Sequence, residues 1–501
     1  MVKTSSLLAV AIVLLSSIDA IGQGQLPPDN LGRPSVSLMQ REAEYYPIID
    51  LYSPEHLAIE AGSFVEMPNK RLAIGTRRGD IFFADGVLQE TPDVEYTKYA
   101  SGLHEVFGLA HRDGDLFATQ QCEVTRIKDT NDDGRADRFE TVSDVWGFGG
   151  EHEFTYGSQF DREGYLWTVH CLTGSYTSEH PFRGWCFRHT PDGKSIPTCS
   201  GLRSPGGIGM NASGDMFYTE NQGPWNGACS LKHLKPGGFM GHPVSFPWYA
   251  DAPNMGPTPE KPQGGRDERQ HIQADRVKQL VPPAIVLPYK KMGQSASAIS
   301  LDTSAGKFGP FANQVFVADY TLSIVMRVDM ENIDGVYQGS CFPFRNGFST
   351  GLIGAVITED GYYVTGGCSR GWPTRGSEPF GLQRMHWSGK VPFEVHSIRI
   401  QPDGFVLKFT QPIDKSTATD AIKIQSYTHY YQQGYGSPEV DQADVAITSA
   451  KLSDDALSLT IQCEGVRRGY VHEFSFAGVK SANGETLLHD VGYYTVNRIP
   501  K

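Results

Sequence analysis

The segment with the clearest chemical signal in this 501-residue chain is a run of oxygen-bearing side chains at residues 129–140. A calcium ion binds several oxygen ligands, and the twelve-residue calcium loop supplies them at fixed positions around a turn glycine, here Gly134. The expected ligands are Asp129, Asn131, Asp133, the Arg135 carbonyl, Asp137 and Glu140. The residues before the loop read as strands, so we expect a structural calcium site in a strand connection.

Four glycine-rich corners, each next to an expected strand, carry the other reactive side chains. They are residues 149–154 with His152, 201–208 with Arg203, 218–226 with Gln222, and 237–243. An imidazole can act as a general base, and a guanidinium can stabilise a developing negative charge. A histidine in a turn is also often only a hydrogen-bonding cap, and Arg203 before a proline could equally anchor a corner of the fold.

Three of these corners resemble the soluble quinoprotein sugar dehydrogenases, which are the glucose/sorbosone dehydrogenase propellers. The resemblance rests on Leu-Arg-Ser-Pro-Gly-Gly-Ile at 202–208, Glu-Asn-Gln-Gly-Pro at 220–224 and Gly-Gly-Phe-Met-Gly-His-Pro at 237–243. It extends at lower similarity over about 57–387. The chain is also similar to exported bacterial proteins described as membrane-bound dehydrogenases, but it lacks the haem-binding domain that they often carry.

The resemblance implies an oxidoreductase that passes hydride from a sugar or polyol to pyrroloquinoline quinone. It implies that His152 removes the hydroxyl proton and that Arg203 stabilises the developing oxyanion. It further implies that Ser204, Gln222 and Arg345 contact the cofactor and that the carbonyls of Gly223 and Pro224 bind a second calcium ion. An external electron acceptor such as a cytochrome would then take the electrons.

Two cations of that family's quinone site are missing from this sequence. Thr321 stands where the family has a lysine, and Arg345 is all that remains of an Arg-x-Arg pair. Each lost charge-assisted contact is worth about 1.5–3 kcal/mol of binding. The alternative function is therefore a non-catalytic, calcium-stabilised propeller that binds carbohydrate or protein.

The elements that must position these side chains follow a repeat. A polar turn followed by a short apolar strand recurs with turns at Gly79, Gly114, Gly164, Gly214, Asn313 and Gly361. The spacing is about 50 residues in the middle of the series and doubles before Asn313, which is typical of propeller blades with one insertion. We predict an all-β fold with a six-bladed β-propeller over 49–390, a rim insertion at about 249–283 and a short helix at 267–280.

The periodicity changes after Trp387, and residues 393–499 read as alternating strands. This pattern predicts a separate immunoglobulin-like β-sandwich. The segment has no concentration of histidines, cysteines or paired carboxylates, so we expect it to serve packing or attachment.

The remaining features predict a protein exported to the periplasm or the extracellular space. Residues 1–22 combine Lys3, an apolar run at 7–15 and small residues near Ala20, which is typical of a signal peptide, and 23–48 form an N-terminal arm. No later stretch is apolar for long enough to span a membrane. The net charge of −13 argues against a nucleic-acid partner. Eight cysteines favour disulfides, with Cys186–Cys199 as the first candidate.

Overall fold

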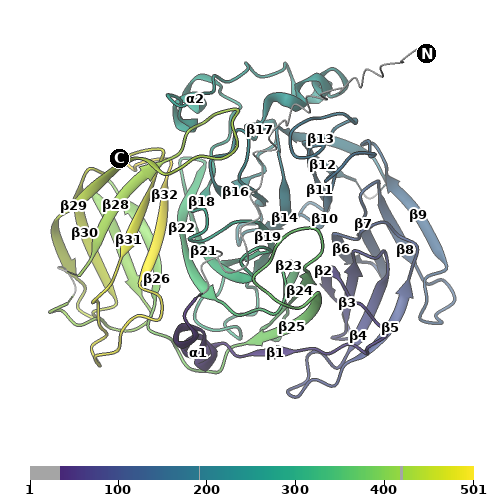
Figure 1. The fold of residues 1–501 in the computed structure, drawn as a ribbon, viewed down its shortest axis with the longest axis horizontal. Coiled ribbons are helices and arrows are strands. Elements are labelled where there is room, and N and C mark those ends of the chain that lie inside the picture. The colour runs from purple at the N-terminus through teal and green to yellow at the C-terminus, as the bar shows by residue number, and fades with distance from the viewer. Residues whose placement is uncertain (1–33, 191, 418–420) are drawn as a thin grey trace, which may run out of the picture.

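The chain forms a β-propeller whose sheets are arranged around a central axis (Figure 1). The computed structural model describes residues 34–190, 192–417 and 421–501, and the predicted signal peptide lies outside them. The innermost strands contact one another in a closed ring: β2 (Ala61–Glu66), β6 (Gly108–Arg112), β10 (Thr155–Phe160), β14 (Pro205–Met210), β19 (Ala296–Leu301) and β23 (Leu352–Ile357). The prediction of an all-β propeller is confirmed.

Five sheets of the described chain stand as separate blades, and their strands pair antiparallel except for the parallel pair β13 and β17. The outer strands of the first two are β3 (Leu72–Thr76), β4 (Ile81–Asp85) and β5 (Glu95–Ala100), then β7 (Asp115–Thr119), β8 (Val124–Lys128) and β9 (Arg138–Ser143). Those of the next two are β11 (Leu166–His170), β12 (Trp185–His189), β13 (Ser195–Ser200) and β17 (Gly238–Phe239), then β15 (Met216–Glu220), β16 (Cys229–His233) and β18 (Ile285–Leu287). The last comprises β24 (Tyr362–Cys368), β25 (Phe380–His386) and β1 (Ile48–Asp50).

The six predicted blades do not form six separate sheets, because β19 does not belong to an independent sheet. Together with β20 (Val315–Asp319), β21 (Ile324–Ile333) and β22 (Val336–Arg345), it starts an eleven-stranded sheet. β22 pairs with β32 (Val491–Val496), and the order continues through β31 (Tyr470–Ser475), β28 (Lys423–Thr428), β29 (Val440–Leu452), β30 (Ser458–Glu464), β27 (Gly404–Phe409) and β26 (Val395–Gln401).

The C-terminal strands share one hydrophobic core. Phe405 of β27 and Ile461 of β30 pack in the same cluster as Phe474 of β31 and Tyr494 of β32. The separate β-sandwich stays a prediction, because main-chain hydrogen bonds join these strands to the propeller through β22 and β32.

The turns that reveal the repeat have the backbone that the sequence pattern requires. Gly114, Gly164, Gly214 and Gly361 each lie between the first two strands of a blade and have φ between 82° and 91°. Gly79 has φ 79° but lies between β3 and β4. The first copy of the repeat is therefore shifted by one strand relative to the others.

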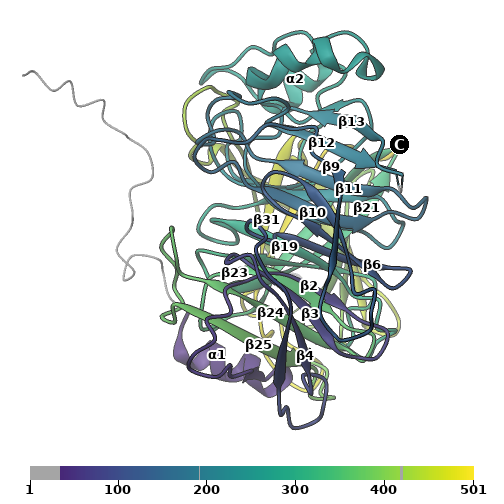
Figure 2. The ribbon, with the colours of Figure 1, turned by 90° about the vertical axis from the view of Figure 1, so that its right-hand side faces the viewer.

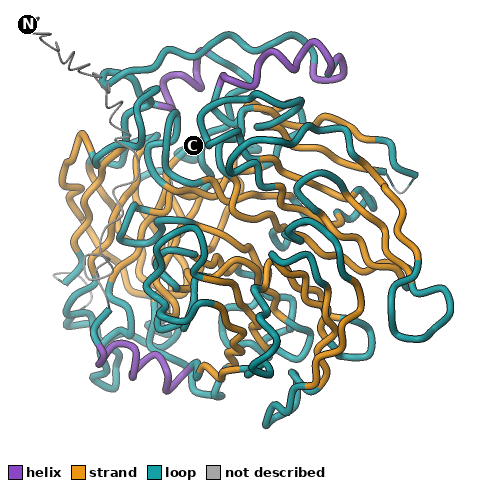
Figure 3. Tube along the Cα trace, turned by 45° about the vertical axis from the view of Figure 1, so that its right-hand side comes forward, coloured by secondary structure: helices purple, strands orange, loops and turns teal. Residues whose placement is uncertain are grey.

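The helices lie outside the strand-built body (Figure 3). α1 (Val36–Tyr45) begins at Ser35, whose side chain accepts a hydrogen bond from the Leu38 amide, and α2 (Gln270–Arg276) falls inside the predicted 267–280 stretch. The two lie at opposite ends of the molecule in both views (Figures 1 and 2). The 3₁₀ segments η2 (Pro243–Asp251) and η3 (Pro253–Met255) precede α2. Within the part of the chain that the structure describes, no helix has the length and apolarity needed to cross a bilayer.

Candidate functional site

A cavity of about 890 Å³ lies among the inner strands and the loops that follow them. Four of the residues predicted from the sequence line it, and they are His152, Arg203, Ser204 and Gln222. They come from the turns before β10 and β14 and from the turn after β15. Segments that are separate along the chain therefore meet at one site. A concave pocket with a few converging polar groups is the usual form of a ligand site.

Arg203 is held rigidly at the wall of this cavity. The buried carboxylate of Glu220 accepts hydrogen bonds from the amides of Arg203 (2.9 Å) and Ser204 (2.7 Å). The Arg203 Nη1 donates to the Gln222 carbonyl at 2.7 Å. A side chain at Gly223 would collide with the guanidinium, since a Cβ there would lie 2.0 Å from the Arg203 Cζ. The Nε of Arg203 is buried and has no hydrogen-bond partner.

His152 is exposed at the mouth of the cavity, and its backbone has a φ of 57°. The next residue, the fully buried Glu153, fixes this turn: its carboxylate accepts hydrogen bonds from the amides of Gly149 and Gly150, from the Thr173 hydroxyl and from His180. Burial acts to raise the pKa of Glu153, but the hydrogen bonds outweigh it and hold that pKa below its ordinary value. Glu153 therefore stays charged and keeps His152 in place.

The predicted calcium ligands Gly223 and Pro224 do not form a metal site. The Gly223 carbonyl already accepts hydrogen bonds from the amides of Asn226 (3.0 Å) and Gly436 (3.1 Å), and Pro224 forms a β-bridge with Tyr435. These contacts bind the turn at Gly223 and Pro224 to the segment between the C-terminal strands. A metal site here would require that turn to open.

The predicted contact of Arg345 with the cofactor is wrong, because Arg345 does not line the cavity. It is buried at the end of β22, where its Nη1 lies 3.2 Å from the Glu42 carboxylate and its Nε donates to the Tyr46 carbonyl at 2.8 Å. Arg345 therefore fastens α1 to the propeller and does not contact a cofactor.

In the 129–140 loop, the predicted ligand side chains form hydrogen bonds within the loop and ion pairs beside it. The Asp129 carboxylate accepts the amide of Gly134 at 2.8 Å, and Asp137 accepts the Thr130 hydroxyl at 2.7 Å. Glu140, the expected bidentate ligand, instead pairs with Arg138 and lies 3.8 Å from Lys128. Across residues 34–190, 192–417 and 421–501, no group of three or more His, Cys, Asp or Glu side chains is arranged to hold a metal. The calcium site at residues 129–140 therefore stays a prediction.

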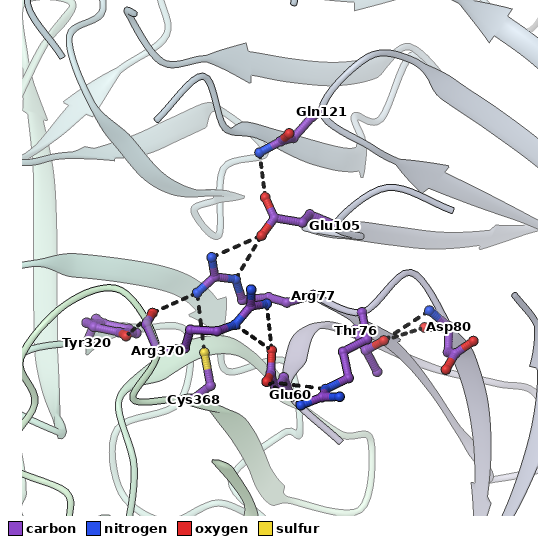
Figure 4. A network of polar contacts seen from close by, with 10 residues as sticks. Glu60, Thr76, Arg77, Asp80, Glu105, Gln121, Tyr320, Cys368 and Arg370 are labelled. Carbon is purple, nitrogen blue, oxygen red and sulfur yellow. Dashed lines mark hydrogen bonds and ion pairs between the residues drawn. The ribbon is translucent and has the colours of Figure 1, made fainter. Parts of the chain in front are cut away.

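Besides Arg203 and Arg370, the cavity is lined by an arginine that no sequence pattern predicted, Arg77, which follows β3 (Figure 4). It forms an ion pair with Glu105 at 3.0 Å and donates to the Arg370 carbonyl at 2.9 Å. The Cys368 thiol lies 3.4 Å from its Nη1. Arg370 in turn pairs with Glu60 at 2.7 Å. Both arginines are thus neutralised by carboxylates outside the lining.

Aromatic side chains form much of the remaining wall, and the sequence analysis singled out none of them. They are Phe107, Phe154, Tyr156, Tyr289, Tyr320, Trp372 and Tyr435. Phe107, Phe154 and Tyr156 lie at the start of inner strands, whereas Tyr320 and Trp372 follow the second strands β20 and β24. Tyr289 follows β18, and Tyr435 lies between β28 and β29. A search for large aromatics beside the blade turns would have found most of them.

The proposed disulfide partners Cys186 and Cys199 face each other across β12 and β13. Both thiols are buried, and no disulfide joins them. The predicted proximity is confirmed, and the bond stays a prediction.

Solved structures of similar fold share little sequence with this chain. The pyrroloquinoline-quinone-bound aldose sugar dehydrogenase of Streptomyces coelicolor is 14% identical with a TM-score of 0.46, covering 68% of this chain and 98% of that one. The quinone domain of Coprinopsis cinerea pyranose dehydrogenase is 12% identical, with a TM-score of 0.47 and coverages of 68% and 95%. A Trichoderma reesei enzyme of carbohydrate-active family AA12 is 12% identical, with a TM-score of 0.48 and coverages of 69% and 97%.

No curated protein matches the sequence. A family model, described as a domain of unknown function, matches residues 85–338. That range contains His152, Arg203, Ser204 and Gln222 together with the strands that carry them. The chain therefore belongs to the DUF7133 family.

Proposed function

We propose that this protein is an exported sugar or polyol oxidoreductase whose substrate and quinone cofactor bind in the central cavity. The observation that carries the proposal is the meeting of His152, Arg203, Ser204 and Gln222 around one space. The resemblance of the sequence to quinoprotein sugar dehydrogenases predicts the same four residues.

The charge of the lining fits an anionic planar group. Carboxylates outnumber lysines and arginines in the chain, 57 to 44, but the cavity lining contains no Asp or Glu. It contains Arg203, whose buried Nε has no partner, and the exposed Lys290. We infer that these two cations hold the carboxylates of pyrroloquinoline quinone, with Ser204 and Gln222 as neutral partners. The aromatic walls suit a flat ring system.

The calcium ion that the resemblance implies does not fit this site. The Gly223 carbonyl is already hydrogen-bonded, and the described residues near it offer no carboxylate cluster. We therefore propose quinone binding that does not depend on calcium.

The side chains support removal of a hydride and a proton from an alcohol. The exposed imidazole of His152, fixed through Glu153, accepts the proton from the substrate hydroxyl. Arg203 lies in the same cavity and stabilises negative charge there. A bound quinone supplies the acceptor for the hydride, and an external acceptor such as a cytochrome removes the electrons afterwards.

The test is reconstitution of the full chain with pyrroloquinoline quinone, with and without calcium, followed by dye reduction with a panel of aldoses and polyols. We expect turnover with at least one substrate, equal in both metal conditions. Absence of turnover in every combination would refute the proposal.

The second candidate is carbohydrate binding without redox chemistry. The neutralisation of Arg77 by Glu105 and of Arg370 by Glu60 favours it, because it leaves fewer cations for a tricarboxylate. Calorimetry distinguishes the two functions: this candidate requires a protein that binds sugar and does not bind the quinone.

A further inference from the structure

A loop from the C-terminal strands reaches across to the propeller. Residues 429–438 connect β28 to β29, and their main chain hydrogen-bonds to the turn that follows β15. The Trp225 amide donates to the Gln432 carbonyl at 2.7 Å, and the Gly436 amide donates to the Gly223 carbonyl at 3.1 Å. The Ser437 amide donates to the Gly227 carbonyl at 3.0 Å. The loop is thus bonded along its length to the turn that carries Gln222.

Tyr431 anchors the loop. Its side chain is 1% exposed and packs against Trp225, with ring centroids 5.2 Å apart. Its hydroxyl donates to the Gly241 carbonyl at 2.6 Å, and its main chain bonds to Gly265 and Glu268 of the rim. A buried aromatic anchor with its polar end satisfied makes a fixed structure, because moving it would leave several buried groups without partners.

This anchoring places Tyr435 in the lining of the central cavity. The Arg203 guanidinium carbon lies 5.2 Å from the centre of the Tyr435 ring and 5.9 Å from that of Tyr176. At the neighbouring Gly436, with φ 60°, a Cβ would lie 2.6 Å from the Gln222 side chain. The loop is therefore in direct contact with two residues that the sequence assigned to the site.

We propose that the 429–438 loop is a fixed wall of the ligand cavity and that Tyr435 packs against the bound sugar and helps to select it. The chemistry of the ligand in this inference rests on the proposed function. A tyrosine ring offers an apolar face to a sugar ring and a hydroxyl to its polar groups. The C-terminal strands thus complete the binding site of the propeller, in addition to packing against it.

The test compares Tyr435→Ala and Tyr435→Phe with the control Gln433→Ala, which changes an exposed residue of the same loop outside the lining. For the best sugar of the panel, we expect Tyr435→Ala to raise KM about tenfold with little change in kcat, because loss of one aromatic contact weakens binding by about that factor. Tyr435→Phe and the control should stay within about threefold of wild type. Wild-type KM in a folded Tyr435→Ala would overturn the proposal.

If the wild type shows no activity, the proposed function is refuted but the fixed wall is not. A second measurement then tests the wall by itself. Gly436→Val adds a side chain where a Cβ meets Gln222. We expect faster hydrogen exchange of the amides at 222–227 in this variant than in wild type, while the amides of β3 are unchanged. Unchanged exchange at 222–227 would show that the loop is not a fixed wall.

Discussion

Replacing Glu42 by glutamine removes the charge at the centre of a buried cluster that joins three parts of the chain. Glu42 lies on α1 and is 1% exposed. Its carboxylate is 3.2 Å from Arg345 at the end of β22 and accepts a hydrogen bond from His489 at 3.0 Å. His489 also contacts the Glu394 carboxylate at 2.6 Å. The cluster therefore ties α1 to the propeller and to the C-terminal strands.

The size of the effect follows from burial and from the pKa of His489. Burial alone would lower this pKa, but Glu394 and Glu42 outweigh it and raise the pKa from 6.5 to about 9. At about 1.4 kcal/mol per pKa unit, the protonated His489 contributes about 3 kcal/mol to the free energy of unfolding. Removal of one partner from a buried ion pair typically costs about 3–5 kcal/mol. We expect Glu42→Gln to destabilise the protein by about 3 kcal/mol.

The sign of the pH dependence is fixed by the direction of each shift. The native pKa of His489 lies above its unfolded value, so its contribution is complete below about pH 6.5 and is lost as the pH rises through about 9. Burial acts to raise the pKa of Glu42, but hydrogen bonds from His489 and Asn346 hold it below its ordinary value. The Glu42 contribution is therefore present above about pH 4.5 and is lost as the pH falls through the native pKa.

The assay is the thermal midpoint of wild type, Glu42→Gln and Glu44→Gln between about pH 6 and pH 10. Glu44 is the matched control, because it is an exposed glutamate on the same helix. We expect Glu42→Gln to melt well below the other two at about pH 6 and the difference to shrink at alkaline pH. A Glu42→Gln protein that melts with the control across the range would refute the reasoning.

Three further predictions concern the cavity. His152→Gln should lower kcat by about 10²–10⁴, because it removes the proposed general base. Its thermal midpoint should be unchanged, because His152 is exposed. Steady-state kinetics and thermal melting check both results, and an active variant would exclude His152 as the base. Gly223→Ala should abolish quinone binding in titrations, since the new Cβ would meet the Arg203 guanidinium; wild-type affinity would contradict it. Glu153→Gln should lower the thermal midpoint most above pH 4.5, because the depressed pKa of Glu153 stabilises the fold there; a uniform loss from pH 3 to 7 would contradict that sign.

Local sequence patterns predict the turns and strands of the blades, but they do not reveal which distant strands and side chains pair. Turns such as Gly114 and Gly164 give the repeat because each blade hairpin needs a residue with positive φ at its turn. His152 and Arg203 could be placed because each lies in the corner that leads into an inner strand, β10 or β14. No local pattern reveals that β22 pairs with β32, whose residues lie about 150 positions further along the chain.

The same limit explains the misplaced site residues. The family resemblance predicts a cofactor contact at Arg345, the remnant of an Arg-x-Arg pair, but its partner Glu42 lies 303 residues earlier on α1. No local pattern reveals Tyr435, because long-range contacts place it in the cavity: the hydrogen bonds of its loop to residues 223–227 and the bond of Tyr431 to Gly241. The family resemblance predicts a calcium ligand at Gly223, and the sequence does not show that the Gly436 amide donates to the Gly223 carbonyl.

The most direct test of the central claim is a binding titration of pyrroloquinoline quinone without calcium, for wild type, His152→Gln and Arg203→Lys. Arg203 contributes a buried guanidinium nitrogen without a partner, whereas His152 is assigned to the substrate proton and not to the cofactor. The account predicts saturable binding by wild type and by His152→Gln, and binding by Arg203→Lys weakened at least about tenfold. No binding by wild type, or equal binding by Arg203→Lys, would contradict it.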